Sequence, residues 1–212
     1  MLLSNYEILD LFVSPHFNDG YRSQIEGFAG ELTVVKPADL QGLGLFKSSR
    51  EALAIARCNP NVKFEILRGE YALALDRIRD PGNLGTILRI ADWYGITKIV
   101  CSKDCAELYN PKVIQSSMGS FTRTMTFYTD LLDFLDTKIP VYGAFLDGTD
   151  VHQTHFKEHG IIVIGNESQG IDRQLQSRID SKITIPKYGK AESLNAAIAT
   201  AVICDALRTK IG

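Results

Sequence analysis

Long apolar runs are absent from this 212-residue chain. A helix needs about 18–20 mostly apolar residues to span a bilayer, and no segment approaches that length, which argues against a membrane protein. The N-terminal stretch MLLSNYEILDLF is amphipathic and carries Glu7 and Asp10, which argues against a signal peptide. Cysteine is also scarce, and its four copies fit a reducing compartment as free thiols. We therefore expect a cytoplasmic protein.

An excess of positive charge is missing as well. Lysine and arginine number 23 against 25 acidic residues, which gives a net charge of -2. Affinity for nucleic acid depends largely on Lys and Arg neutralising phosphates, so a nucleic-acid protein of this composition needs a locally basic surface. The candidates for such a surface are Arg77, Arg79, Arg89, Lys187 and Lys190.

Metal-ligand spacing is lacking too. Cys101 and Cys105 lie four residues apart, but no second ligand pair stands at zinc spacing. A helix could align His152, His155 and His159, yet zinc would need a further ligand and a closed geometry. The sequence predicts no metal site.

What the chain does contain is a regular pattern that begins at Ala72. Apolar runs of strand length alternate with helix-length segments, which predicts a parallel sheet covered by helices on both faces. The expected strands are Ala72–Leu75, Lys98–Cys101, Met125–Tyr128, Val141–Phe145, Ile161–Ile164 and Lys182–Ile185.

The first third of the chain is less regular. Residues 1–67 contain a probable strand at Leu32–Val35, a glycine-rich segment at Gln41–Gly44 and another strand at the end of Ser49–Arg57. We interpret residues 1–67 as a small α/β domain, residues 68–71 as a linker and residues 72–212 as a second domain.

The first of three motifs is LDRIRDPGNLGTILRIADWYG, at Leu75–Gly95. Pro81-Gly82 marks a turn, and Asn83 is a good N-cap for a helix that ends near Tyr94. Leu84 belongs to an apolar stripe of this helix, whereas Arg89 lies roughly 140° away from it and is not needed for packing. Gly85 would allow close approach to another backbone or to a nucleotide. The alternative interpretation makes Arg89 a solvated charge and Asn83 a plain cap.

The second and third motifs also follow strands. In IIVIGNESQGID, at Ile161–Asp172, the strand ends at Gly165, and ligands of α/β sheets bind beyond such strand ends. In ITIPKYGKAESLNAAIA, at Ile183–Ala199, a loop leads into a helix with Ser193 as a credible N-cap. That helix is apolar almost all round, which predicts burial on more than one side, either as a central core helix or against a partner.

Together the three motifs resemble the SpoU/TrmH family of S-adenosylmethionine-dependent RNA ribose 2′-O-methyltransferases, part of the SPOUT superfamily. The resemblance covers roughly residues 72–212. It implies an α/β fold with a parallel sheet, helices on both faces and a C-terminal trefoil knot, preceded by a small RNA-binding domain that is shortened here. It further implies S-adenosylmethionine as cofactor, transfer RNA or ribosomal RNA as substrate, and a homodimer.

The resemblance also assigns site residues. The positions matching catalytic groups of the family are Asn83, Arg89, Glu167, Ser193 and Asn195, and those matching cofactor contacts are Gly165, Ile185 and Leu194. In the family, the arginine is often described as a general base. An arginine side chain is almost never neutral near pH 7, so orientation of a substrate phosphate is the other role left open.

Several alternatives remain open at this stage. Residues 1–67 either capture RNA or form a scaffold for solubility or dimerisation. The whole chain is either a ribose methyltransferase, a base methyltransferase of the same superfamily, or a non-catalytic RNA-binding or assembly protein.

Ala197 replaces a serine of the family pattern, but the polar pair Ser193 and Asn195 is kept. Trp93 and Tyr94 either stack on a base or serve packing and dimer contacts.

Overall fold

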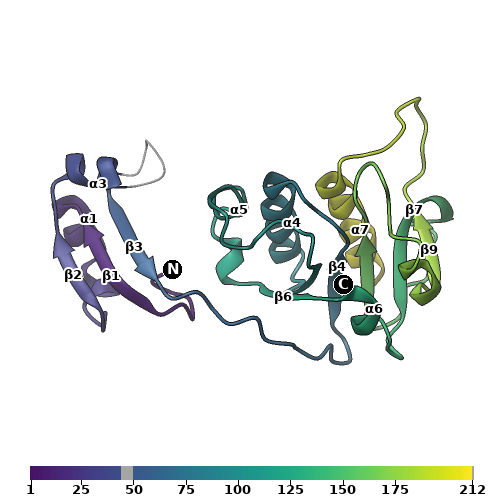
Figure 1. Cartoon of the computed structure of the whole chain (residues 1–212), viewed down its shortest axis with the longest axis horizontal. Helices are drawn as coiled ribbons and strands as arrows, with labels where there is room; N and C mark the ends of the chain where they lie inside the picture. Colours follow the sequence, from purple (N-terminus) through teal and green to yellow (C-terminus); the bar gives the residue numbers. More distant parts are fainter. Residues whose placement is uncertain (44–49, 212) are drawn as a thin grey trace. The chain divides into compact units, whose positions relative to one another are not determined.

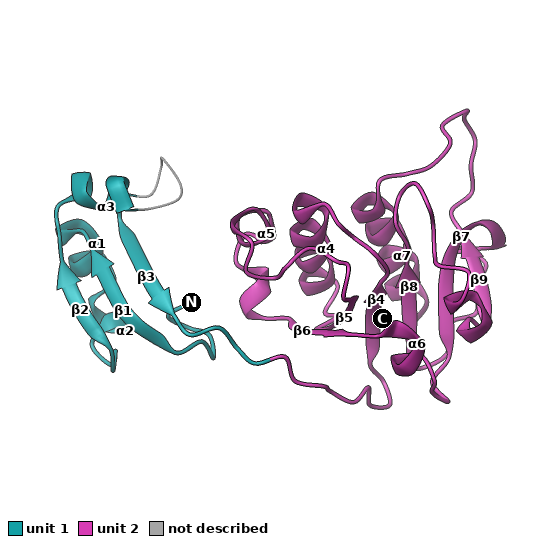
Figure 2. Cartoon of the chain, in the orientation of Figure 1, with its two compact units in different colours: residues 1–60 teal, residues 61–212 magenta. Residues whose placement is uncertain are grey.

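The computed structural model describes residues 1–43 and 50–211 and divides them into two compact units, 1–60 and 61–212 (Figure 2). The division lies between Pro60 and Asn61, whereas the sequence predicts a linker at residues 68–71. The difference arises because Phe64 is buried in the core of the second unit and Tyr71 already belongs to its first strand.

The first unit is a three-stranded sheet with short helices. Its elements are β1 (Ile8–Val13), α1 (Pro15–Gly20), α2 (Arg22–Ile25), β2 (Glu31–Val34), α3 (Pro37–Leu43) and β3 (Ala52–Ala56). The strand order is β2-β1-β3, parallel for the first pair and antiparallel for the second. Leu11, Val13 and Ile25 form its core. Both predicted strands are present; Gly44 and Ser49, at the edges of two predicted segments, lie outside the described residues.

The second unit contains a six-stranded sheet in which every pairing is parallel, as predicted (Figure 1). The strands are β4 (Tyr71–Leu75), β5 (Lys98–Ser102), β6 (Met125–Thr129), β7 (Val141–Asp150), β8 (Gly160–Ile164) and β9 (Ser181–Thr184). Their order is β6-β5-β4-β8-β7-β9. Each predicted strand is confirmed to within a few residues, except that β7 continues to Asp150.

Helices and short 3-10 turns cover this sheet. They are α4 (Pro81–Trp93), α5 (Pro111–Ser117), η1 (Ser120–Thr122), α6 (Leu131–Phe134), η2 (Leu175–Arg178) and α7 (Ala196–Ile211). Ala74 of β4 packs in one cluster with Leu131 of α6 and Leu175 of η2. Its strand neighbours Leu73 and Leu75 point to the opposite face and are fully buried too, so both faces of the sheet are covered.

Buried β-branched and leucine side chains explain why the central strands form. All five residues of β4 and all five of β8 are buried, the pattern of strands covered on both faces. β4 and β8 pair along their whole length, ending at Leu75 opposite Ile164. The loops that follow these two strands therefore leave the sheet side by side, and they carry the first and second motifs.

Candidate functional site

The start of α4 differs from the sequence prediction. The helix begins at Pro81, and its N-cap is Asp80, whose carboxylate accepts a hydrogen bond from the Asn83 backbone N–H at 2.8 Å. Asn83 as the N-cap was therefore wrong. Proline is well suited to the first helical position because it needs no N–H partner there, which makes the preceding aspartate the cap. The hydrogen bond from the Asn83 N–H also holds the pKa of Asp80 below its ordinary value.

With the cap provided by Asp80, the side chain of Asn83 is available for tertiary contacts. Its amide N–H donates to the carboxylate of Glu167, and its amide oxygen accepts from Nδ2 of Asn195 at 2.9 Å. Asn83, from the first motif, thus contacts one side chain from the second motif and one from the third. We call Glu167, Asn83 and Asn195 the polar chain of the site.

The start of α7 was also mispredicted. The helix begins at Ala196, and Asn195 acts as its cap, with its side-chain oxygen accepting from the N–H groups of Ala197 at 3.0 Å and Ile198 at 3.3 Å. Ser193 is exposed and lies two residues before that cap. The cap and the polar chain share Asn195, because its amide offers an oxygen to the helix and an N–H to Asn83.

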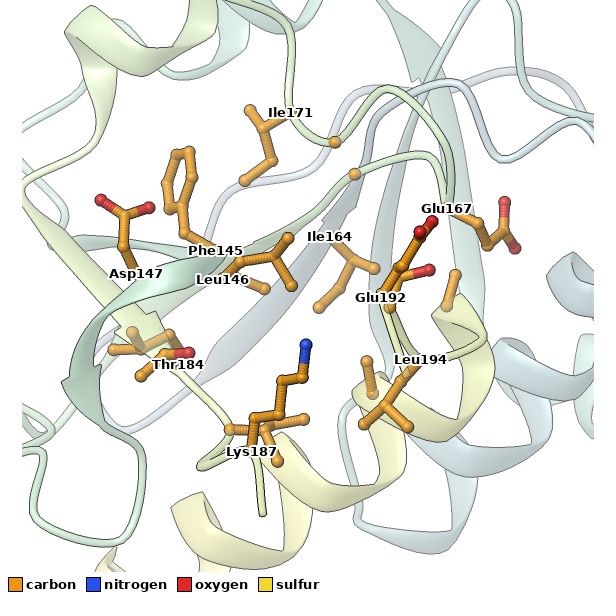
Figure 3. Close-up of a pocket in the computed structure, with 18 of the residues that line it drawn as sticks. Phe145, Leu146, Asp147, Ile164, Glu167, Ile171, Thr184, Lys187, Glu192 and Leu194 are labelled. Atoms are coloured by element: carbon orange, nitrogen blue, oxygen red, sulfur yellow. The ribbon is translucent and has the colours of Figure 1, made fainter. Parts of the chain in front are cut away.

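Beside the polar chain lies a cavity of about 530 Å³ (Figure 3). The loops after β8 and β9 form much of its wall. The predicted site residues that line it are Gly165, Glu167, Ile185, Ser193 and Leu194. Asn83 and Asn195 are not in the lining and reach it through their hydrogen bonds to Glu167 and to each other.

Sequence reasoning missed the contribution of β7 to this cavity. The pairing of β7 with β9 shifts register between Ala144 and Thr149, and the intervening Phe145, Leu146 and Asp147 line the cavity. Figure 3 shows these three side chains around one side of the hollow. The signal was available as an Asp-Gly pair at 147–148 inside a strand-like run, which indicates a break in regular pairing.

The glycines of the second motif allow the loop to fold back on itself. A Cβ at Gly165 would stand 2.4 Å from the backbone of Gly170 and Ile171, which no side chain permits. Gly170 has a φ of +65°, a region that favours glycine. Gly165 is therefore required for the close approach of two loop segments that both line the cavity.

The five predicted basic residues separate into two groups: Arg79, Arg89, Lys187 and Lys190 are exposed, and Lys187 lines the cavity, whereas Arg77 is mostly covered. Arg89 lies on α4 outside the cavity lining and outside the polar chain. Arg77 does not belong to a free basic surface, because its side chain is only 18% exposed and pairs with the carboxylates of Asp76 and Asp172. Arg77 was therefore wrong as a candidate for a local basic surface.

A pair of buried thiols lies under the loop after β4. Hydrogen bonding from Cys101 lowers the pKa of Cys105 to about 7, aided by Ser102 and by the backbone N–H of Ile78, while the pKa of Cys101 is raised. The sulfur of Cys105 accepts from the Ile78 N–H at 3.3 Å and donates to the carbonyl of Leu75 at 3.2 Å. These contacts fix the loop that leads into α4. All four cysteines are free, as predicted.

Two further predictions concern the three histidines as metal ligands and the presence of membrane-spanning helices. His152 follows β7 in a turn, and His155 and His159 lie in irregular chain instead of a helix. Within the described residues no group of three or more His, Cys, Asp or Glu side chains could hold a metal ion. None of the helices in residues 1–43 and 50–211 has the length and apolar character that a bilayer crossing requires.

Comparison with known proteins gives consistent matches. The model of the SpoU rRNA Methylase family matches residues 70–205. The 23S rRNA (guanosine(2553)-2'-O)-methyltransferase RlmP of Bacillus subtilis is 34% identical over 141 residues, covering 64% of this chain and 57% of the relative. A 23S rRNA (uridine(2479)-2'-O)-methyltransferase of Streptomyces viridochromogenes is 32% identical over 148 residues, covering 64% of this chain and 52% of the relative.

Solved structures match over both units. A protein from Porphyromonas gingivalis assigned to the TrmH family of RNA methyltransferases is 30% identical, with a TM-score of 0.82 over 97% of this chain and 84% of that chain. The SpoU methyltransferase AviRb of Streptomyces viridochromogenes, solved with AdoMet, shares the fold at 24% identity, with a TM-score of 0.84 over 98% of this chain and 85% of that chain.

The chain spans about half the length of the curated relatives it matches. The family match nonetheless covers all three motifs, including the polar chain and the loops around the cavity. On these grounds the chain belongs to the SpoU rRNA Methylase family.

Proposed function

We propose that this protein transfers a methyl group from S-adenosylmethionine to a ribose 2′-hydroxyl of ribosomal or transfer RNA. The observation that carries the proposal is the polar chain of Glu167, Asn83 and Asn195, which unites the three motifs at the edge of one cavity. The names of the relatives support it, because two of them are rRNA 2'-O-methyltransferases.

The cavity suits the cofactor in size and chemistry. Its volume of about 530 Å³ lies within the range of small-molecule sites, roughly 300–1,000 Å³. Ile164, Ile185 and Leu194 offer apolar walls for an adenine ring, and exposed backbone of the loop at Gly165 offers hydrogen-bonding groups. AviRb, which shares the fold, was solved with AdoMet. The bound cofactor would supply a methyl group carried by a positively charged sulfur.

The side chains of this protein would act by positioning. Methyl transfer needs the ribose oxygen in line with the methyl group and a group that takes the hydroxyl proton, and alignment alone supplies a large part of such a rate enhancement. Glu167, held by Asn83, would fix the loop beside the ribose, and Ser193 would lie at the cavity mouth. Arg89 would approach the substrate phosphate with its planar fork, or assist removal of the proton through that phosphate.

The direct test is methyl transfer by the purified chain. We expect incorporation of label from radioactive S-adenosylmethionine into RNA, insensitive to EDTA, at a ribose that then resists alkaline cleavage. Calorimetry should show cofactor binding in the presence of EDTA. Abolition of binding by the chelator, or label found on a base, would contradict the proposal.

Arg89 offers a sharper test because it is exposed on α4 and is not one of the buried residues of that helix. Arg89→Ala should abolish transfer with little change in cofactor affinity. Arg89→Lys should also fail, because an ammonium group cannot reproduce two parallel hydrogen bonds to a phosphate. Arg173→Ala is the matched control, an exposed arginine that does not belong to the predicted basic surface. Full activity of Arg89→Ala would make Arg89 an ordinary surface charge.

We further propose that the first unit captures RNA and that the enzyme acts in the cytoplasm, where its substrate is found. The unit has a core of its own in Leu11, Val13 and Ile25, which supports a separate role.

We also propose a C-terminal trefoil knot in the segment after β9, and a homodimer through α4 and α7. Exposed Trp93 on α4 and exposed Ile198 on α7 support such an interface.

A further inference from the structure

Arg77 has an unusual backbone conformation. Its φ is +56°, and Met118 is the one other non-glycine residue with a positive φ among the described residues. A side chain in this region is disfavoured, and it persists where surrounding contacts hold it.

Each backbone N–H of the turn formed by Asp76, Arg77 and Ile78 makes a hydrogen bond. The backbone N–H of Asp76 donates to the carbonyl of Ile164 at 2.9 Å, and that of Arg77 donates to Ser102 Oγ at 2.9 Å. The next N–H, of Ile78, donates to Cys105 Sγ. The turn is thus fixed from β8 and from β5 with the loop that follows it, on the two sides of β4.

This conformation directs the guanidinium group of Arg77 toward the second-motif loop. Its Nη2 lies 3.0 Å from Asp76 Oδ2, and its Nη1 lies 3.2 Å from Asp172 Oδ2. The same group donates to Gln169 Oε1 at 3.2 Å and to the carbonyl of Gly170 at 3.4 Å.

The backbone and the buried carboxylate complete the link between the two loops. The carbonyl of Arg77 accepts from Asn166 Nδ2 at 3.1 Å, and Asp76 accepts from the Asp172 N–H at 2.8 Å. Asp76 is almost fully buried, and Arg77 is the ion-pair partner that offsets the cost of burying its carboxylate. Both ends of the loop from Asn166 to Asp172 are therefore held by Asp76 and Arg77.

We infer that Arg77 is a positioning residue that holds the second-motif loop in the shape that binds the cofactor. Between the ends that it fixes lie Glu167, Gly170 and Ile171, all of which line the cavity. Arg77 itself is not in the lining. The inference rests on the proposed function, since it assigns the cavity to S-adenosylmethionine.

The experiment compares cofactor affinity by calorimetry in the wild-type chain, Arg77→Lys, Arg77→Gly and Arg79→Ala. Lysine keeps the charge and the backbone requirement but loses the fork. Glycine loses the side chain but adopts a positive φ without strain. We expect both Arg77 variants to raise the Kd by about tenfold or more, the scale of one or two lost charge-assisted hydrogen bonds. Arg79→Ala should leave the Kd unchanged.

Amide hydrogen exchange without cofactor separates positioning from general stability. We expect faster exchange confined to residues 165–172 in Arg77→Lys, with the melting temperature close to that of the wild type. If Arg77→Gly prevents folding because Asp76 is left unpaired, two other variants test the inference. They are Arg77→Lys and Asp172→Asn, the second of which removes the half-exposed carboxylate that pairs with Arg77.

Three results would overturn the inference. The first is a Kd within twofold of the wild type in Arg77→Lys. The second is loss of protection throughout the second unit, which would make Arg77 a general structural residue. The third is a wild-type chain that binds no S-adenosylmethionine, which refutes the proposed cofactor site as well; the first two leave the proposed function intact.

Discussion

Asn83 occupies the position at which all three motifs meet. It lies in the first turn of α4, where its backbone N–H is already bonded to Asp80, so its amide is free to join Glu167 and Asn195. An amide suits this place because it donates on one side and accepts on the other. A carboxylate in its place could not donate to Glu167.

We therefore expect Asn83→Ala to impair catalysis more than binding. Loss of the amide leaves Glu167 and Asn195 without their shared partner, and misplacement of such groups lowers rates by about a hundredfold. The Kd for S-adenosylmethionine should change little, because Asp76 and Arg77 still hold both ends of the second-motif loop when the contact of Asn83 with Glu167 is lost. Steady-state methyl transfer and calorimetry measure the two quantities. Gln153→Ala, at an exposed position of the second unit outside the cavity lining, is the control, and wild-type turnover by Asn83→Ala would contradict the role.

Asp92 predicts a pH dependence of stability. Its carboxylate, 22% exposed, pairs with Arg123 at 2.6 Å and accepts from Ser120 Oγ at 2.8 Å, and Arg123 is the main reason that its pKa lies below the ordinary 3.8. The unfolded chain thus binds this proton more readily than the folded chain does. The stabilisation is complete above pH 3.8 and is lost as the pH falls through the lower folded pKa.

Asp92→Asn should lower the free energy of unfolding at pH 7 by about 1 kcal/mol, because a charge-assisted hydrogen bond is lost. The difference from the wild type should shrink below about pH 4 as the wild-type carboxylate is protonated. Urea unfolding at several pH values measures this difference in the free energy of unfolding. Asp104→Asn, at an exposed position, is the control. A difference that grows in acid would contradict the assigned direction of the pKa.

At the scale of elements, the strands were predictable and the helix starts were not. β4 and β8 are apolar along their whole length because both sheet faces are covered, and that pattern is visible in the sequence. The first turn of α4 offers two residues, Asp80 and Asn83, with similar capping propensity. Pro81 at the first helical position favours Asp80 as the cap, and the Asn83 side chain instead contacts Glu167, which the fold brings there from another motif.

The packing of α4 on α5 (Pro111–Ser117) depends on Gly85. A Cβ there would lie 2.5 Å from the carbonyl oxygen of Val113 and 2.1 Å from Ser116 Oγ. The sequence predicts that either another backbone or a nucleotide approaches Gly85 closely. In the structure, the backbone of α5 does so. A carbonyl cannot move aside as a side-chain end can.

Gly85→Ala should lower the free energy of unfolding by about 1–3 kcal/mol, the usual cost of overpacking, despite the better helix propensity of alanine. Gly189→Ala is the control in the same unit. Its new Cβ would meet nothing within 4 Å. Urea unfolding compares the two variants. Equal stability of Gly85→Ala and wild type would show that the helices separate without cost.

For the whole molecule, local sequence patterns could not supply strand order or side-chain pairing between motifs. β4 lies between β5 and β8, and β8 comes far later in the chain. Arg77 illustrates the consequence. As one of several arginines near a helix start it was a candidate for a local basic surface, but the loop after the neighbouring β8 brings Asp172 against it and places it inside a salt-bridge network.

The proposed dimer is the last prediction and concerns the surface of α4 and α7. These helices pack on each other, and each leaves a large apolar side chain in solvent: Trp93 is 85% exposed and Ile198 is 53% exposed. Burial of such side chains between two copies would stabilise a two-fold dimer, the commonest soluble oligomer. Sedimentation equilibrium at micromolar concentration should therefore give twice the chain mass of 23.5 kDa.

Ile198→Asp combined with Trp93→Ser should shift the sedimenting species to a monomer, because a carboxylate at a buried interface is costly without a partner. Ile55→Asp is the matched control, since Ile55 is 47% exposed on β3 of the first unit. It should leave the mass unchanged. A wild-type chain that sediments as a monomer would refute the dimer, and the open faces of α4 and α7 would then belong to the solvent-exposed surface of a single catalytic unit.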